Sequence, residues 1–212
     1  KYGIYPKGVS RSFAPKDVYR VFLNLVKYGQ FRQNLKNHVI QDGEKGKRSK
    51  LKMNVIDLFC GCGGFSKGFE QAGFDVRLGV DVWQDAVTTY KANFPNTATI
   101  VGDLSHLNGE NLLSAAGITA DEVDVIIGGP PCQGFSVSGK RMLDDPRNIL
   151  YKSFVRMVEF IKPKAFVMEN VPGLVKLFNG QVKDQVIEDF TNIGYKVQMR
   201  QLTACDYGVP QA

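Results

Sequence analysis

The stretch "NVIDLFCGCGGFSKGF", residues 54 to 69, decides the fold class. It joins an apolar run of strand length to a glycine-rich loop and then to a helical pattern. Gly61, Gly63 and Gly64 allow a sharp turn and a close approach of the backbone to a ligand, because no Cβ stands in the way. Phe65 and Phe69 then recur at helical spacing on a face that also holds Ala72, and Gly73 closes it. This order predicts an α/β sheet.

The alternation of short strands and helices continues along the chain. The residues at 86, 87, 90 and 94 mark a second helical face. Tight loops and right-handed crossovers favour a parallel, doubly wound, Rossmann-like sheet, in which the fourth and fifth strands are neighbours and functional sites collect at the carboxyl ends. The predicted strands are residues 54–59, 75–82, 98–104, 123–129, 165–170 and 196–203.

Residues 1–52 differ from the rest in charge. They hold 13 Lys and Arg against 3 Asp and Glu, whereas the other 160 residues hold 14 against 18. Such a basic segment suggests a polyanionic partner such as nucleic acid, the alternative being a solvated arm. Its apolar spacing suits two short amphipathic helices hinged near Gly29, followed by a charged linker at 41–50. We therefore predict a basic helical extension and linker at 1–52, and a cofactor-binding and catalytic part at 53–212.

Composition narrows the class of protein. Hydrophobic residues make up 43% and charged residues 23%, which is ordinary for a globular domain. No apolar run approaches the ~20 residues of a membrane span, and the first residues lack an apolar signal segment. The chain is therefore expected in the cytoplasm, without a membrane partner. Four cysteines without paired CxxC spacing, and two histidines, predict reduced thiols and no metal site.

Acidic residues at two strand ends predict a cofactor. Asp81 ends the second strand, where a carboxylate can accept hydrogen bonds from ribose hydroxyls. Asp103 ends the third, where it could accept from an adenine amino group. Together with the glycine loop, these acids indicate an adenosine-containing cofactor. The alternative is that they only cap neighbouring helices.

A cysteine follows two prolines at the end of the fourth strand, in "VIIGGPPCQGFSVSG", residues 125–139. A thiol there sits on a stiffened turn, and Cys132 becomes a nucleophile where its surroundings favour the thiolate. Glu169 and Asn170 end the neighbouring fifth strand, so nucleophile and acid would face one pocket. The alternatives are an inert buried cysteine and a glutamate that caps backbone.

Six motifs in this order resemble those of the cytosine-C5 DNA methyltransferase family. They are "DLFCGCGGFSKGF", "GDL", "GGPPCQGFS", "DPRNIL", "MENVPGL" and "DYGVPQ", running from about Met53 to Gln211. The resemblance implies a Rossmann-like, S-adenosylmethionine-dependent fold. It also implies a cytosine flipped out of double-stranded DNA as methyl acceptor.

The resemblance implies roles for individual residues. Cys132 would add to C6 of cytosine and Glu169 would bind the base's N3 and amino edge, while Asn170 braces their loop and Pro131 shapes the turn. The implied cofactor-binding residues are Phe59, Gly61, Gly63, Asp81, Val82, Asp103, Leu104, Pro130 and Leu150. The implied DNA-binding residues are Gln133, Ser136, Ser138 and Arg147.

The sequence also departs from the family pattern. Asp81 stands where the family usually has Glu, and Val82 where an aromatic ring often stacks on the adenine. After "YGVPQ" the family continues with a target-recognition region and closing motifs, and its last core strand lies beside the fifth. The resemblance therefore predicts a sheet incomplete at its C-terminal end, with residues 196–203 unpaired. Further polypeptide or a second subunit would complete it.

The functional expectation is a bacterial or phage restriction-modification enzyme that acts on nucleoid DNA. One alternative is the tRNA-methylating branch of the family, against which Gln133 and Gly134 argue. The other is a non-catalytic nucleic-acid-binding or regulatory module of the same fold. Intact Cys132 and Glu169 argue against that alternative.

Overall fold

The structure is a computed structural model that describes residues 52–131, 149–171, 174 and 180–207. The helices and linker predicted within 1–52 lie outside the described residues, apart from Lys52. The segment that carries Cys132 lies outside them as well.

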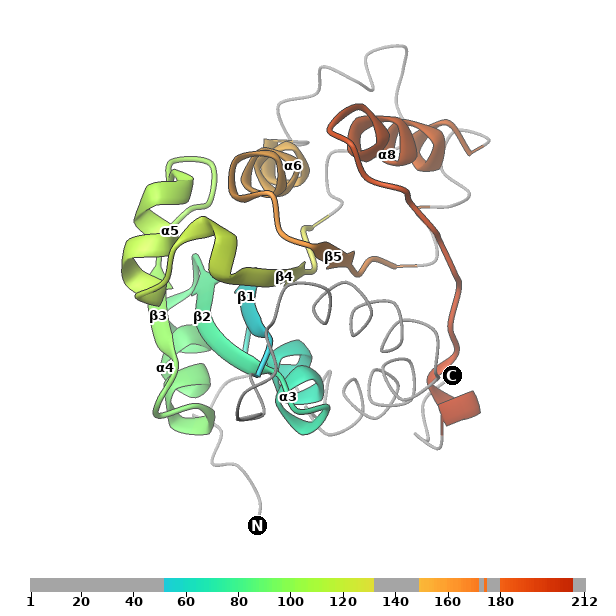
Figure 1. The fold of residues 1–212 in the computed structure, drawn as a ribbon. Coiled ribbons are helices and arrows are strands. Elements are labelled where there is room, and N and C mark those ends of the chain that lie inside the picture. Colours follow the sequence, from blue (N-terminus) through green and yellow to red (C-terminus); the bar gives the residue numbers. More distant parts are fainter. Residues whose placement is uncertain (1–51, 132–148, 172–173, 175–179, 208–212) are drawn as a thin grey trace, which may run out of the picture.

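A five-stranded parallel sheet forms the centre of the described part, in the order β3-β2-β1-β4-β5 (Figure 1). This confirms the predicted Rossmann-like, doubly wound topology and the adjacency of the fourth and fifth strands. The chain order reverses direction between β1 and β4, which is where such sheets bind ligands at their carboxyl ends. The strands are β1 Asn54–Leu58, β2 Asp75–Asp81, β3 Ala98–Val101, β4 Val123–Gly128 and β5 Ala165–Met168.

Helices cover both faces of the sheet (Figure 1): α3 and α4 lie on one face, and α5, α6 and α8 on the other. A capping box between Asn108 and Asn111 begins α5, and Gly117 in the left-handed conformation ends it. The helices are α3 Gly64–Gln71, α4 Gln84–Asn93, α5 Gly109–Ala116, α6 Ile149–Ile161 and α8 Gln181–Asn192, with short 3-10 turns at Ala120–Glu122 and Ala204–Tyr207.

Alternate residues of each strand point to opposite faces and build two core layers. Ile56 and Leu58 pack toward α5 and α6, while Val55 packs against Phe69 of α3. On the face covered by α5 and α6, α8 is anchored by Phe190, whose ring stacks on that of Phe166 with centroids 4.0 Å apart. Phe69, Val87, Tyr90 and Phe94 are all buried, which confirms both helical faces predicted from spacing.

The strand predicted at 196–203 is wrong, because these residues form no strand. A strand needs a partner for its backbone groups, and within the described part of the chain β5 pairs only with β4. The third strand is also shorter than predicted. It ends at Val101 because the chain turns at Asp103, whose carbonyl accepts from the backbone N–H groups of His106 and Leu107.

No described helix is both long and apolar enough to cross a bilayer. No group of three or more His, Cys, Asp or Glu side chains in that part of the chain is arranged to hold a metal ion.

Candidate cofactor and catalytic site

The glycine loop after β1 leaves its backbone open to a ligand. Gly61 has φ +52, and a Cβ built on it would meet no atom within 4 Å. Gly63 has φ +94, and a Cβ there would lie 2.2 Å from the ring of Phe94. Phe59 also has a positive φ of 63, which is costly for a residue with a side chain and is typical of functional loops. Gly63 thus allows close packing, while Gly61 offers free space above the loop.

Asp81 at the end of β2 holds this loop in place. Its Oδ2 accepts from the Gly61 backbone N–H at 2.8 Å, and its Oδ1 accepts from that of Trp83 at 3.0 Å. The Cys60 N–H donates to the Val80 carbonyl at 2.9 Å, which ties loop and strand together a second time. Each carboxylate oxygen can accept more than one hydrogen bond. Asp81 can therefore orient the loop and still accept from ribose hydroxyls.

A buried polar chain lies beneath the loop. The Ser66 hydroxyl donates to Asp57 Oδ2 at 2.6 Å and lies 2.7 Å from the hydroxyl of Tyr90, which therefore donates to it. Asp57 is fully buried, and its Oδ1 has no hydrogen-bond partner. Burial raises the pKa of Asp57 to about 7, the bonds from Ser66 oppose this, and the charge of Asp81 adds to it. Asp57 was not among the predicted site residues, although an acid inside an apolar strand run is a visible signal.

The ends of β2 and β3 combine an acid with exposed apolar side chains. Hydrogen bonds from Ser105 lower the pKa of Asp103, so this carboxyl stays an ionised acceptor. Val82 is 56% exposed and Trp83 is 74% exposed directly after β2. Trp83, which is not among the predicted site residues, thus presents an exposed aromatic ring next to Val82. Leu104, in contrast, is buried in the core, so only its backbone is available to a cofactor.

The predicted catalytic residues Glu169, Asn170 and Pro131 lie where β4 and β5 end. The Glu169 N–H donates to the Gly128 carbonyl at 2.9 Å, and Asn170 Nδ2 donates to the Pro130 carbonyl at 3.0 Å. A Cβ on Gly129 would lie 3.1 Å from Glu169 Oε2, so the carboxyl lies directly over this turn. Glu169 is solvent accessible, yet the protein around its carboxyl desolvates it enough to raise its pKa.

The remaining predicted residues divide into two groups. Pro131 is exposed and is the last described residue before Cys132, while Leu150 is half-buried at the start of α6. Cys132, Gln133, Ser136, Ser138 and Arg147 lie outside the described residues. Burial raises the pKa of the Cys60 and Cys62 thiols, so neither is suited to act as a nucleophile.

Backbone contacts join these parts into one continuous edge. The Gly102 N–H donates to the Asp81 carbonyl at 2.9 Å, which joins the ends of β3 and β2. A Cβ on Gly128 would lie 2.1 Å from the Leu58 carbonyl oxygen, so β4 and β1 meet closely at the reversal point. The cofactor acids therefore lie on one side of this point and Glu169 on the other. An open glycine loop, a ribose acceptor and an adenine acceptor in one row fit an adenosine-containing cofactor.

Comparisons with known proteins agree with this arrangement. A family model described as C-5 cytosine-specific DNA methylase matches residues 53–212. The chain is 51% identical over 165 residues to the Type II methyltransferase M.DdeI of Desulfomicrobium norvegicum, covering 76% of this chain and 38% of that protein. It is 48% identical over 164 residues to M1.HphI of Haemophilus parahaemolyticus, covering 76% and 44%.

A solved structure is also similar. It is of an E. coli protein assigned as a DNA modification methyltransferase encoded within a prophage, and it matches with a TM-score of 0.56 at 39% identity, covering 66% of this chain and 38% of that one. The chain spans 38% and 44% of the lengths of the two curated relatives above. The match over residues 53–212 implies S-adenosylmethionine as the methyl donor and confirms the predicted resemblance. This chain belongs to the C-5 cytosine-specific DNA methylase family.

Proposed function

We propose that this chain is the cofactor-binding and catalytic part of a restriction-modification enzyme that methylates C5 of cytosine in double-stranded DNA. One observation carries the proposal. The Asn170 bond to the Pro130 carbonyl brings a carboxyl of raised pKa over the turn that leads into Cys132. This supports the proposal that Cys132 and Glu169 act on the same base.

Cys132 acts first in the proposed reaction. Its thiolate forms a bond to C6 of the flipped cytosine, and the C5=C6 electron pair then makes C5 a nucleophile. Glu169, whose pKa is raised by desolvation, holds N3 and supplies a proton that offsets the charge developing on the ring. Once C5 carries the methyl group, its proton is lost to water. The electron pair left on C5 re-forms the C5=C6 double bond while the S–C6 bond breaks with its electron pair returning to sulfur, and the proton on N3 returns to Glu169.

S-adenosylmethionine supplies a methyl carbon activated by the positive sulfur beside it. On the adenosine side of the site, the exposed backbone at Gly61 accommodates the cofactor, Asp81 accepts from the ribose and Asp103 accepts from the adenine amino group. Trp83, which follows Val82 in the sequence, offers an exposed ring to the adenine. Its neighbour Val82 contributes apolar surface of smaller area.

The same enzyme requires further polypeptide, as a C-terminal part or a second subunit. Among the described residues, β5 is an edge strand paired on one side only, and residues 196–203 run extended without strand pairing. A strand added next to β5 would satisfy its free backbone groups. This polypeptide would also carry target recognition. We place the assembled enzyme on DNA in the cytoplasm of a bacterium.

Covalent trapping tests this function. In a duplex containing 5-fluorocytosine, fluorine replaces the C5 proton, so the final elimination is blocked and the enzyme stays attached. We expect the chain to form an S-adenosylmethionine-dependent adduct, alone or when supplied with the C-terminal part of a relative. The Cys132→Ser and Glu169→Gln variants should form none. Cys205→Ser is the matched control, because this exposed cysteine lies outside the site.

The outcomes separate the alternatives. An adduct that persists in Cys132→Ser would disprove the assigned nucleophile. Adducts on 5-fluorocytosine tRNA but not on duplex DNA would favour the tRNA-methylating alternative. Binding to DNA without any adduct, in the presence of the added C-terminal part, would favour a non-catalytic module.

A further inference from the structure

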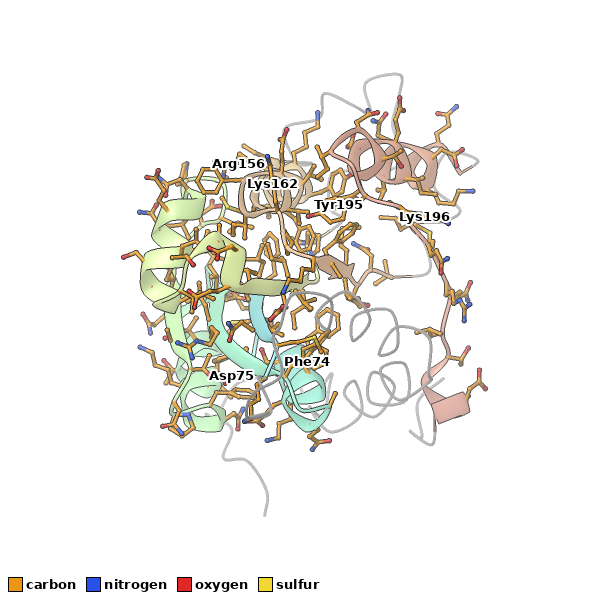
Figure 2. The ribbon with its side chains drawn as sticks, in the orientation of Figure 1. Phe74, Asp75, Arg156, Lys162, Tyr195 and Lys196 are labelled. Carbon is orange, nitrogen blue, oxygen red and sulfur yellow. The ribbon has the colours of Figure 1, made fainter. Side chains whose placement is uncertain are left out.

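Arg156 on α6 gathers three backbone carbonyls of the loop that follows β3. Its Nη2 donates to the carbonyl of Leu104 at 2.8 Å, to that of Leu107 at 3.0 Å and to that of Ser105 at 3.3 Å. Figure 2 shows Arg156 on α6, in the part of the molecule where α6 and α5 approach each other. These partners are about fifty positions away along the chain, so this contact was not visible in the sequence.

The loop that Arg156 holds begins at Asp103. The Asp103 carbonyl accepts from the N–H groups of His106 and Leu107 at 3.0 and 3.3 Å, and its Oδ1 accepts from the Ser105 N–H at 2.8 Å. Residues 103–107 thus form a tight turn whose amides point back to Asp103. The carbonyls of Leu104, Ser105 and Leu107 accept no hydrogen bond from an amide of this turn. The guanidinium of Arg156 satisfies them, as a basic side chain does at the C-terminus of a helix.

We propose that Arg156 is a positioning residue that fixes Asp103 for recognition of the cofactor's adenine. The inference rests on the proposed function, in which Asp103 accepts from the adenine amino group. Asp103 is only partly buried, with its side chain 39% exposed, so core packing does not set its position. The turn sets it, and Arg156 anchors the turn.

The contacts of Arg156 separate this role from a general effect on folding. The residue is solvent exposed, whereas its helix neighbours Met157 and Val158 are almost fully buried. Replacing the guanidinium therefore removes little buried surface and leaves the α6 core contacts in place. All three bonds come from one nitrogen, so a lysine ammonium, which has three N–H donors, can replace much of the interaction. Arg156→Lys should retain the role that Arg156→Gln loses.

Two measurements on the full chain test the proposal, with Lys152→Gln as control, because Lys152 is also exposed on α6. The first is amide hydrogen exchange. Arg156→Gln should speed exchange at 104–108 and leave β1 and β4 unchanged. The second compares the dissociation constants of S-adenosylhomocysteine and S-inosylhomocysteine, read from the fluorescence of Trp83, the chain's single tryptophan. The inosine form has a carbonyl where adenine has its amino group, so Asp103 disfavours it.

We expect Arg156→Gln to weaken binding of S-adenosylhomocysteine about tenfold and to change binding of S-inosylhomocysteine little. The preference for the adenine form would then be lost. Arg156→Lys should keep most of it. Unchanged exchange at 104–108, or an unchanged preference in Arg156→Gln, would overturn the positioning role alone. Failure of the unaltered chain to bind either nucleoside would instead overturn the proposed cofactor site, and the adenine role with it.

Discussion

Asp57 is a fully buried carboxyl whose hydrogen bonding is incomplete. One oxygen of its carboxyl accepts a hydrogen bond from the Ser66 hydroxyl, and the other oxygen has no hydrogen-bond partner. The carboxyl also interacts electrostatically with Asp81 and Cys60. A buried carboxylate without full hydrogen bonding destabilises the native state when it ionises. The glycine loop is therefore built directly over a group whose protonation changes near neutral pH.

This predicts a pH dependence of stability. The pKa of Asp57 is about 7 in the native state against 3.8 for an ordinary aspartate, so the native state binds the proton more tightly. Its contribution is most favourable below the unfolded pKa and is lost as the pH rises toward the folded pKa. Between pH 5 and pH 8 the free energy of unfolding should fall by on the order of 2 kcal/mol from this group. Asp57→Asn should remove that fall.

Urea unfolding over this pH range provides the measurement. The difference between the unaltered chain and Asp57→Asn isolates the group from all other titrations. Asp121→Asn is the control, since Asp121 is exposed. Parallel curves for the unaltered chain and Asp57→Asn would contradict the prediction.

At the scale of elements, the junction of β1 and β4 is the tightest point of the sheet. The backbone of Gly128 passes so close to the Leu58 carbonyl that a Cβ would overlap its oxygen at 2.1 Å. A Cβ on the neighbouring Gly129 would come closest to the flexible end of Glu169, at 3.1 Å from Oε2, with the Glu169 carbonyl oxygen at an ordinary 3.9 Å. Gly128 is therefore required by the close approach of two strand backbones, whereas Gly129 leaves room for the Glu169 side chain.

Replacing Gly128 or Gly129 by alanine should therefore have different consequences. Gly128→Ala should lower the free energy of unfolding by about 3 kcal/mol or more, because backbone must move and the β1–β4 pairing is disturbed. Gly129→Ala should cost within about 1 kcal/mol but displace the Glu169 carboxyl and reduce adduct formation. Chemical denaturation and the trapping assay together check both. Similar losses of stability in the two variants would refute the distinction.

The elements also show which features a sequence can reveal. The first five strands were predictable because short apolar runs of strand length alternate with helical patterns, and both are local features of the chain. Residues 196–203 have the same local pattern but no partner, and strand formation depends on pairing between distant segments. The Arg156 and Asn170 contacts were invisible for the same reason. The cofactor acids were predictable because their place at strand ends follows from the order of elements.

At the scale of the whole molecule, charge is divided between the two parts of the chain. The extension is strongly basic, whereas the methylase part has a small acidic excess. Counterion release makes each Lys or Arg that meets a phosphate visible in the salt dependence of binding. The extension is therefore expected to supply much of the nonspecific affinity for DNA.

Neutralising four residues of the predicted linker tests this expectation. We expect Lys45, Lys47, Arg48 and Lys50 changed to Gln to make the slope of log affinity against log salt shallower by roughly 3 to 4. The control changes Lys91, Lys162, Lys183 and Lys196 to Gln in the methylase part. Fluorescence anisotropy with a duplex gives both slopes. Equal changes in the two variants would show that the extension has no special role.

The burial of Cys60 and Cys62 has a consequence for chemical modification. Alkylating reagents attack thiolates, and both residues keep their protons because burial raises their pKa. Brief treatment of the native chain with iodoacetamide should therefore spare the glycine loop and mark the other two cysteines, of which Cys205 is exposed. With Cys205 replaced, the mass of the alkylated chain would count the reactive nucleophile directly, without cofactor or DNA.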